Sequence, residues 1–439
     1  MSILLRIRHC GVMNYQHRTA KLSNGTTLVT IHRPEAATST ISAHLRVGSR
    51  FETRKQRGLS HFLEHMVFQG CELYPTPRAV NIAAEFMGST LDAATARDYT
   101  QFEHQVANDA LNESAELLAS LLRTPVFGNL ESERSIILEE AMDEFSADGR
   151  RIDPDTLTKQ ALWGKSGLGQ PIIGDLETIQ GFTRTDLERF HKQHYCGQNL
   201  VLSIASPFSH QEMTATAKPF EKIPVGTRSH FKPVSKVFVR PKVMLIPEQR
   251  SQCDCRLIFP TAGRRIENNR RFIMLRRALD DGLASRMQER LGNELGLAYD
   301  QWAYWESYPD TGAFELAAVV SPDKVPVFFS EIWRLLKTLI DDPPTGKELD
   351  RLRFRVRWGL QSAIESASGL IALHAFPNLY DETDEAIAER LTCLNSITAE
   401  DLSRAAASLL SKPFIASVMG PCEGLSARKI RHAIENAKA

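Results

Sequence analysis

The sequence predicts an α+β fold of two domains, each built from a sheet and packed helices. With 439 residues, the chain exceeds the length at which one hydrophobic core stops growing. In both halves, short strand-like patterns come before helical periodicity. The expected strands are 28–31, 41–47, 243–246 and 254–259, and the expected helices are 76–87, 109–123 and a long one at 268–292.

The stretch 207–242 separates the two halves. It loses clear periodicity and collects residues that interrupt regular structure: Pro207, Pro219, Pro224, Gly226, Pro233 and Pro241. We therefore predict an N-terminal domain at 1–225, a linker at 226–242 and a C-terminal domain at 243–439.

Composition excludes several classes of protein. The 53 basic residues balance the 53 acidic ones, so no overall field attracts nucleic acid or an acidic membrane. A hydrophobic content of 42% is typical of a globular protein. No apolar run approaches the roughly eighteen residues of a membrane span. Seven cysteines, an odd number in a long chain, indicate free thiols instead of a disulfide framework.

The N-terminal residues bear on location. The apolar core of 1–8 is too short for a secretory signal, and Arg6 and Arg8 interrupt it. We therefore expect a cytoplasmic protein of a bacterial cell. A mitochondrial matrix protein is the alternative, because the residues up to Arg18 contain no acid and several Arg and His.

The stretch 58–68 carries the clearest chemical signal. On a helix, His61 and His65 lie one turn apart and point the same way, with Glu64 close to the same face. Paired histidines also occur by chance on many helices. The order His-x-x-Glu-His, however, mirrors the His-Glu-x-x-His zinc motif and is the inverzincin signature. A catalytic zinc needs a third protein ligand as well.

A second critical stretch, 129–145, is strongly acidic with an apolar side, as in a partly buried helix. Most of its acidic residues are expected on the solvent-exposed face of the helix. Glu133 and Glu140, however, are seven residues apart and share one side of the helix. Glu139 points about 100° away from Glu140. Glu140, and secondarily Glu133, are therefore candidates for a metal site.

These two stretches together resemble the pitrilysin/insulinase family of inverzincin metallopeptidases, of the half-length type that includes the mitochondrial processing peptidase beta subunit and bacterial homologues. The resemblance covers essentially the whole chain. Other segments that resemble family landmarks, in order, are Gly48-Ser49-Arg50-Phe51-Glu52, Asp92-Ala93-Ala94-Thr95, Gly174-Asp175-Leu176-Glu177-Thr178-Ile179 and Tyr195-Cys196-Gly197-Gln198-Asn199-Leu200-Val201-Leu202.

The resemblance implies a role for each site residue. His61, His65 and Glu140 would bind Zn²⁺, Glu64 would be the general base, and Glu133 would support the site. Two neutral imidazoles and one carboxylate leave the zinc one positive charge, which suits the acidification of a bound water.

The resemblance also implies substrate-binding residues. Asp92 and Ala93 match a strand that holds the substrate, although the family usually has Asn at the position of Asp92. Tyr299 matches a residue that contacts substrate. The Arg that accompanies this Tyr in the family falls on Gly292 here, and the nearest candidate, Arg290, is two residues early.

By resemblance, the fold is a duplication, with two similar domains that each hold a mainly antiparallel sheet, and two half-length chains enclose one chamber. The expected function is a zinc endopeptidase that hydrolyses peptides or unfolded segments in that chamber. The partner is a second copy or a paralogous chain, with the paralogue favoured, and neither nucleic acid nor a membrane is expected. The alternatives are a catalytic chain that is inactive without its paralogue and a non-catalytic scaffold subunit.

Other features have structural interpretations. Cys253 and Cys255 could bind metal, but no second pair accompanies them, so a strand is the better interpretation. His191 and His194 lack an acidic neighbour in the sequence and are expected at the end of a helix.

Overall fold

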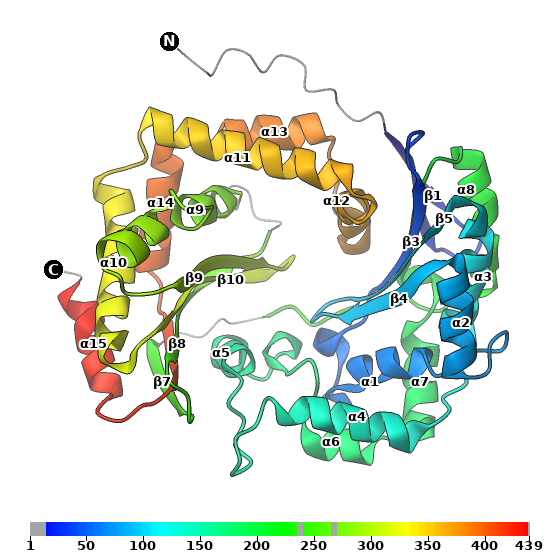
Figure 1. The fold of residues 1–439 in the computed structure, drawn as a ribbon, viewed down its shortest axis with the longest axis horizontal. Helices are drawn as coiled ribbons and strands as arrows, with labels where there is room; N and C mark the ends of the chain where they lie inside the picture. Colours follow the sequence, from blue (N-terminus) through cyan, green and yellow to red (C-terminus); the bar gives the residue numbers. More distant parts are fainter. Residues whose placement is uncertain (1–14, 235–239, 265–269, 438–439) are drawn as a thin grey trace. The chain divides into compact units, whose positions relative to one another are not determined.

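The computed structural model describes residues 15–234, 240–264 and 270–437. These residues form two compact units, each assembled from separate parts of the chain (Figure 1). Unit 1 takes its described residues from Met1–Ala141, Gln170–Phe231 and Gly359–Asp384, and unit 2 from Met142–Gly169, Lys232–Trp358 and Glu385–Ala439. Each unit therefore includes a segment from the other half of the sequence. The contiguous boundaries at 225 and 243 stay a prediction.

Unit 1 contains a six-stranded mixed sheet with the order β1-β2-β6-β3-β5-β4. Only β2 and β6 run parallel, and every other neighbouring pair is antiparallel. Because β4 pairs with β5 alone, it is an edge strand. The strands are β1 (Gln16–Lys21), β2 (Thr27–His32), β3 (Thr38–Leu45), β4 (Gly88–Thr95), β5 (Thr100–Ala107) and β6 (Leu200–Ser206).

Unit 2 contains a five-stranded mixed sheet with the order β7-β11-β8-β10-β9. Its one parallel pair joins β7 to β11. Cys253 and Cys255 lie in β8, which confirms the strand interpretation of this segment. The strands are β7 (Lys242–Pro247), β8 (Cys253–Ala262), β9 (Asp300–Ser307), β10 (Thr311–Val320) and β11 (Ile415–Gly420).

The two sheets share one topology. If β1 is set aside, the order β2-β6-β3-β5-β4 repeats as β7-β11-β8-β10-β9, with the single parallel pair at the same end. The prediction of an α+β fold with two similar sheet-and-helix domains is therefore confirmed. The duplication is visible in the strand order, whereas identity between the two halves of the sequence is faint.

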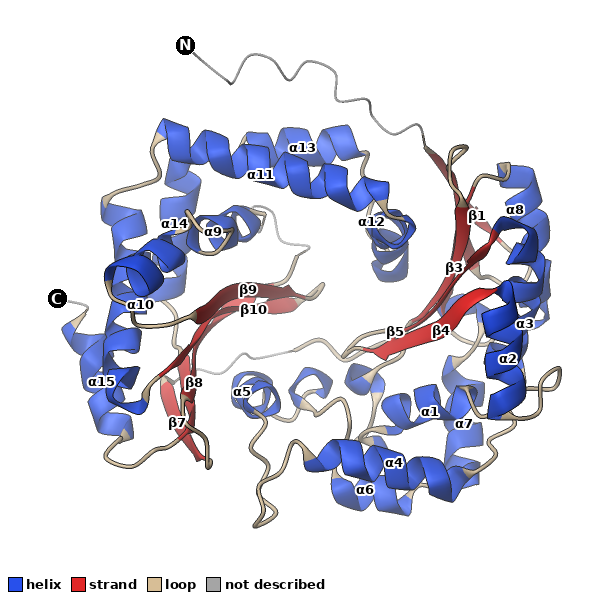
Figure 2. Ribbon diagram, in the orientation of Figure 1, coloured by secondary structure: helices blue, strands red, loops and turns tan. Residues whose placement is uncertain are grey.

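Helices cover both faces of the sheet in unit 1. Helices α2, α3 and α8 lie on one face and α12 on the other (Figure 2). The phenyl ring of Phe376 in α12 contacts His44 of β3 and Tyr99. The helices of this unit are α1 (Leu59–Val67), α2 (Pro77–Met87), α3 (Leu111–Arg123), α4 (Leu130–Met142), α6 (Leu176–Gly181), α7 (Arg184–His194), α8 (His210–Thr216) and α12 (Ala367–Tyr380).

The helices of unit 2 pack mainly on one another and on the sheet. The most amphipathic long helix is α10, whose apolar face buries Phe328, Phe329 and Leu336. The helices are α5 (Pro154–Trp163), α9 (Arg271–Leu279), α10 (Val325–Asp341), α11 (Gly346–Glu365), which continues into unit 1, α13 (Ile387–Asn395), α14 (Ala399–Leu410) and α15 (Ala427–Asn436).

The start of α1 is fixed by two residues. Gly58 has a φ of 88°, and a Cβ at this position would lie 2.3 Å from the carbonyl oxygen of Ile173. The buried carboxylate of Glu52 accepts hydrogen bonds from the backbone N–H groups of Gly58 (2.9 Å) and Ser60 (2.7 Å). These bonds satisfy donors that a helix N-terminus otherwise leaves unpaired. Burial raises the pKa of Glu52 to about 7.

Two expectations about secondary structure are wrong. The long helix expected over 268–292 is interrupted after α9, because Gly282 adopts a left-handed φ of 86°, and a π-helical turn follows at Gln288–Glu294. The start of that prediction, 268–269, lies outside the described residues. The aperiodic stretch 207–242 contains α8, which Ser209 caps in a capping box with Glu212.

Candidate metal centre

Helix α1 presents His61 and His65 from one side. Its other side buries Phe62, Leu63 and Met66 in the core of unit 1. The two imidazole rings lie 4.7 Å apart between centroids and are inclined by 65°, so their nitrogen atoms can point toward a common position. Both rings are partly exposed, at the border between core and solvent.

Glu140 of α4 completes a group of three possible ligands. Its carboxylate lies 3.5 Å from His61 Nε2 and 3.7 Å from His65 Nε2. Tetrahedral zinc with bonds of about 2.1 Å holds neighbouring ligand atoms about 3.4 Å apart. Half of the Glu140 side chain is exposed, which leaves the site open to solvent. The residues present therefore fit a zinc ion with one open coordination position.

Glu133 determines which nitrogen of His65 is available. Its Oε2 lies 3.3 Å from His65 Nδ1, and its Oε1 accepts a hydrogen bond of 2.5 Å from Gln69 Nε2. Gln69 in turn accepts from the side chain of Asn129. A carboxylate at Nδ1 favours the tautomer with its proton there, which leaves Nε2 unprotonated and facing Glu140. The sequence pointed to Glu133, but it gave no signal for Gln69 or Asn129.

His61 is suited to metal binding because it stays neutral. Burial, with a smaller contribution from His65, lowers its pKa to about 4. A neutral imidazole is the form that coordinates a metal. Its Nδ1 is buried and has no hydrogen-bond partner among the described residues.

Glu64 lies beside the ligands on α1 and is buried to 9% exposure. Its carboxylate accepts a short hydrogen bond from the hydroxyl of Thr95, the last residue of β4. Burial raises the pKa of Glu64 above its ordinary value, and the Thr95 bond opposes this only in part. Burial raises the pKa of the Tyr195 phenol well above its ordinary value, and the nearby charge of Glu64 raises it further. A carboxylate of raised pKa beside a metal site is suited to accept a proton.

Asp92 and Ala93 lie on the edge strand β4. Asp92 is exposed and pairs in register with Glu103 of β5, and Ala93 is opposite Phe102. Thr95 follows on the same side of the strand as Ala93. The same strand therefore carries the two expected substrate-binding residues and the hydrogen-bond donor of Glu64.

Tyr299 and Arg290 belong to unit 2, whereas His61, His65 and Glu140 belong to unit 1. The Tyr299 side chain is fully exposed. Arg290 forms ion pairs with Glu294 (2.6 Å) and Glu331 (2.8 Å). Gly292 lies in the π-helical turn, where a Cβ would meet the Gln288 amide at 2.4 Å.

A second cluster of similar composition lies elsewhere in unit 1. His17 Nε2 and His374 Nδ1 lie 3.3 Å and 3.0 Å from the carboxylate of Asp384. The two imidazoles are stacked, with centroids 3.8 Å apart and planes inclined by 22°. A metal lies close to the plane of each imidazole that binds it, and two nearly parallel rings at this spacing have no such common point. The cluster is a hydrogen-bonded His-Asp-His group.

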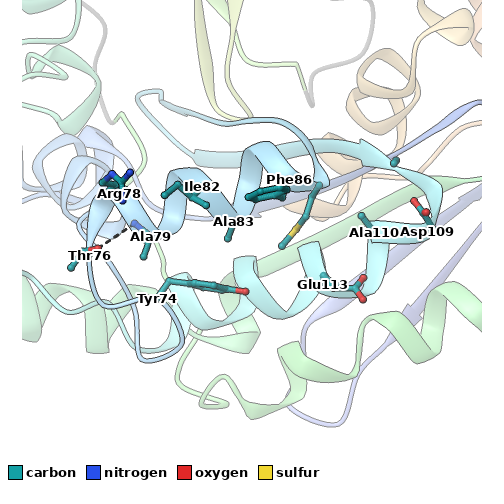
Figure 3. A pocket seen from close by; sticks show the side chains of 12 residues that line it. Tyr74, Thr76, Arg78, Ala79, Ile82, Ala83, Phe86, Asp109, Ala110 and Glu113 are labelled. Atoms are coloured by element: carbon teal, nitrogen blue, oxygen red, sulfur yellow. Dashed lines mark hydrogen bonds between the residues drawn. The ribbon is translucent and has the colours of Figure 1, made fainter.

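A hollow of about 740 Å³ lies between α2 and the segment that leads into α3 (Figure 3). The apolar side chains of Ile82 and Phe86 contribute to its lining, which includes no histidine or cysteine. It shares no residue with the group of His61, His65 and Glu140.

Two family models match the chain. The model described as Insulinase (Peptidase family M16) matches residues 27–176, which contain all of His61, Glu64, His65 and Glu140. The model described as Peptidase M16 inactive domain matches residues 181–356. The chain belongs to peptidase family M16. The resemblance to the pitrilysin/insulinase family that the sequence indicated is therefore confirmed.

M16 relatives match over nearly their whole length. An uncharacterized zinc protease of Rickettsia bellii is 27% identical over 93% of this chain and 98% of its own. The uncharacterized zinc protease YmxG of Bacillus subtilis is 26% identical over 91% of this chain and 97% of its own. These relatives are named as zinc proteases, in agreement with the donor set at α1 and α4.

Solved structures share the fold. A protease from Helicobacter pylori aligns with a TM-score of 0.82 at 20% identity over 92% of this chain and 99% of its own. The first half of the periplasmic protease PqqL from Escherichia coli aligns with a TM-score of 0.76 at 17% identity, over 96% of both chains. Within the described ranges, no helix has both the length and the apolar character of a membrane span.

Proposed function

We propose that this M16 chain is a zinc-dependent endopeptidase whose ligands are His61, His65 and Glu140. The observation that carries the proposal is the convergence of their donor atoms within 4.8 Å of one another, next to the buried carboxylate of Glu64. When bound, zinc supplies a water of lowered pKa and polarises the scissile carbonyl.

The other parts of the proposed mechanism are assigned to residues of the chain. Glu64 accepts the proton of the attacking water and returns it to the leaving amine. Glu133 holds His65 in the tautomer that presents Nε2. The edge strand β4, which carries Asp92 and Ala93, leaves one side free to pair with an extended peptide. Tyr299, which is fully exposed, is a further proposed substrate-binding residue.

The substrate class that we propose is peptides or unfolded segments, cleaved in a chamber that two half-length subunits enclose. Support comes from the full-length PqqL protease, in which this chain matches 50% of the length. The second subunit is a paralogous chain or a second copy. We propose a cytoplasmic location in a bacterium, with the mitochondrial matrix as the alternative.

The test is hydrolysis of a quenched fluorescent peptide by the purified chain, alone and mixed with a paralogous chain. We expect turnover that a chelator removes and stoichiometric zinc restores. Turnover by the chain alone indicates a homodimer, whereas turnover only in the mixture indicates a heterodimer. A chain that binds zinc but cleaves no peptide in either case would contradict the proposal.

The alternative is a non-catalytic scaffold subunit. A scaffold has no physical need for three converging ligands and an adjacent buried base. Buried charged groups cost stability, so their presence together favours the enzyme.

A further inference from the structure

Thr95 contacts the candidate general base directly. It ends β4, two residues after Ala93, and its Oγ1 donates a short hydrogen bond to Oε2 of Glu64. A carboxylate has two oxygens that can accept a proton, and they become inequivalent when one of them already holds a hydrogen bond.

The direction of this hydrogen bond follows from the carboxylate, which when ionised has no proton to donate. Thr100 Oγ1 lies 3.5 Å from Thr95 Oγ1, but it donates its single proton to the carbonyl oxygen of Val47 at 3.0 Å. Thr100 is fully buried, so its hydroxyl has no water to bond instead. Thr95 Oγ1 therefore has two possible acceptors, and the nearer of them, Oε2 of Glu64, takes its proton.

The other oxygen of Glu64 is not held in this way. Among the described residues, no side chain donates to Oε1, although the backbone N–H of Thr95 also interacts with the carboxylate. The nearby hydroxyl of Tyr195 is buried and also makes no hydrogen bond within the described part of the chain.

We propose that Thr95 is a positioning residue, which holds Oε2 of Glu64 and leaves Oε1 as the oxygen that accepts and returns the proton. This inference rests on the proposed function. It adds that one oxygen of Glu64, Oε1, carries the proton. An O–H bond of the attacking water breaks, its proton passes to Oε1, and the electron pair stays on the oxygen that bonds to the peptide carbon. When the C–N bond breaks, Oε1 gives that proton to the leaving nitrogen.

The structure offers a matched set of variants for a test. Thr95→Val removes the hydroxyl and keeps the shape and branching of the side chain. Thr95→Ser keeps the hydroxyl. Thr90→Val makes the same exchange at an exposed position of the same strand.

We expect Thr95→Val to lower kcat about tenfold to a hundredfold, because a misplaced base loses alignment with the water. KM should stay within about twofold, and zinc content should stay at about one per chain, because Thr95 touches no ligand. Thr95→Ser should recover most of kcat, and Thr90→Val should match the wild type.

A double-variant cycle separates positioning from general structure. In a Glu64→Gln background, Thr95→Val should leave the residual rate unchanged, because the group on which Thr95 acts has already been replaced. A kcat of wild-type size in Thr95→Val, or a Thr95→Ser variant as slow as Thr95→Val, would overturn the inference. If Glu64→Gln itself keeps full activity, the proposed function fails instead.

Discussion

Two clusters in unit 1 contain the same inventory, two histidines and one carboxylate, yet only one has the geometry of a metal site. In the first, the rings of His61 and His65 are inclined by 65° and both present Nε2 to Glu140. In the second, the rings of His17 and His374 are stacked at 22° around Asp384. Metal binding depends on whether the lone pairs converge, not only on which residues gather.

The charges of the two clusters differ for a related reason. At Asp384, burial would raise the pKa, but the hydrogen bonds of His17 and His374 outweigh burial and hold the pKa well below its usual range. Each histidine there directs a nitrogen at the carboxylate. In the first cluster, burial instead keeps His61 neutral, with its pKa at about 4, so its lone pair remains available.

The largest expected effect comes from removing one ligand. His65→Ala should reduce zinc from about one per chain to a small fraction and abolish peptidase activity, because two donors do not hold the ion. His374→Ala is the matched control, and it should retain zinc. Metal analysis after gel filtration checks both variants. A wild-type zinc content in His65→Ala would contradict the assignment of His65 as a ligand. A loss of zinc from a folded His374→Ala variant would show that the second cluster binds the metal.

Glu64→Gln should affect catalysis without affecting binding. We expect at least about a thousandfold loss of kcat with zinc content unchanged, because the amide cannot accept the proton. Turnover of the quenched peptide and metal analysis on the same sample check this. A variant that loses its zinc would show that Glu64 helps to hold the metal.

Glu133→Ala should weaken the site without emptying it. Loss of the hydrogen bond to His65 Nδ1 should lower zinc affinity about tenfold to a hundredfold, as measured by competition with a chromophoric chelator. Glu139→Ala, on an exposed neighbouring residue of α4, is the control and should leave affinity unchanged. Equal zinc affinities in the two variants would show that Glu133 does not support the site.

A further effect, on stability and not on the metal centre, concerns His44, a buried histidine. Burial lowers its pKa to about 4, below the unfolded value of about 6.5. The unfolded state therefore binds more protons between these values, and stability should fall as pH falls from 6.5 to 4, by on the order of 3 kcal/mol. Urea unfolding of His44→Phe should show a weaker pH dependence than the wild type. An unchanged dependence would assign the effect to other histidines.

The sequence predicted the parts of the site that depend on local periodicity. The i, i+4 spacing of α1 determines the faces of His61 and His65, and the two-turn spacing of α4 places Glu133 and Glu140 on one side. The helix end at His194 and the strand through Cys253 are also as predicted. The roles of the site residues and the domain boundaries stay predictions.

Contacts between distant segments were not predictable from local patterns. Thr95 meets Glu64 only because β4 packs beside α1, and Glu52 caps α1 only through the turn at Gly58. The break at Gly282 depends on a backbone conformation that helical periodicity does not reveal. The shared strand order of the two sheets was likewise hidden, because pairing across a sheet leaves little trace in identity.

The exchange of segments between the units has a consequence for biosynthesis. Helix α12 covers one face of the sheet of unit 1, yet it is encoded more than 150 residues after β6. During translation, the segments that form this sheet emerge from the ribosome well before α12. That face of the sheet therefore stays uncovered until nearly the whole polypeptide has been made.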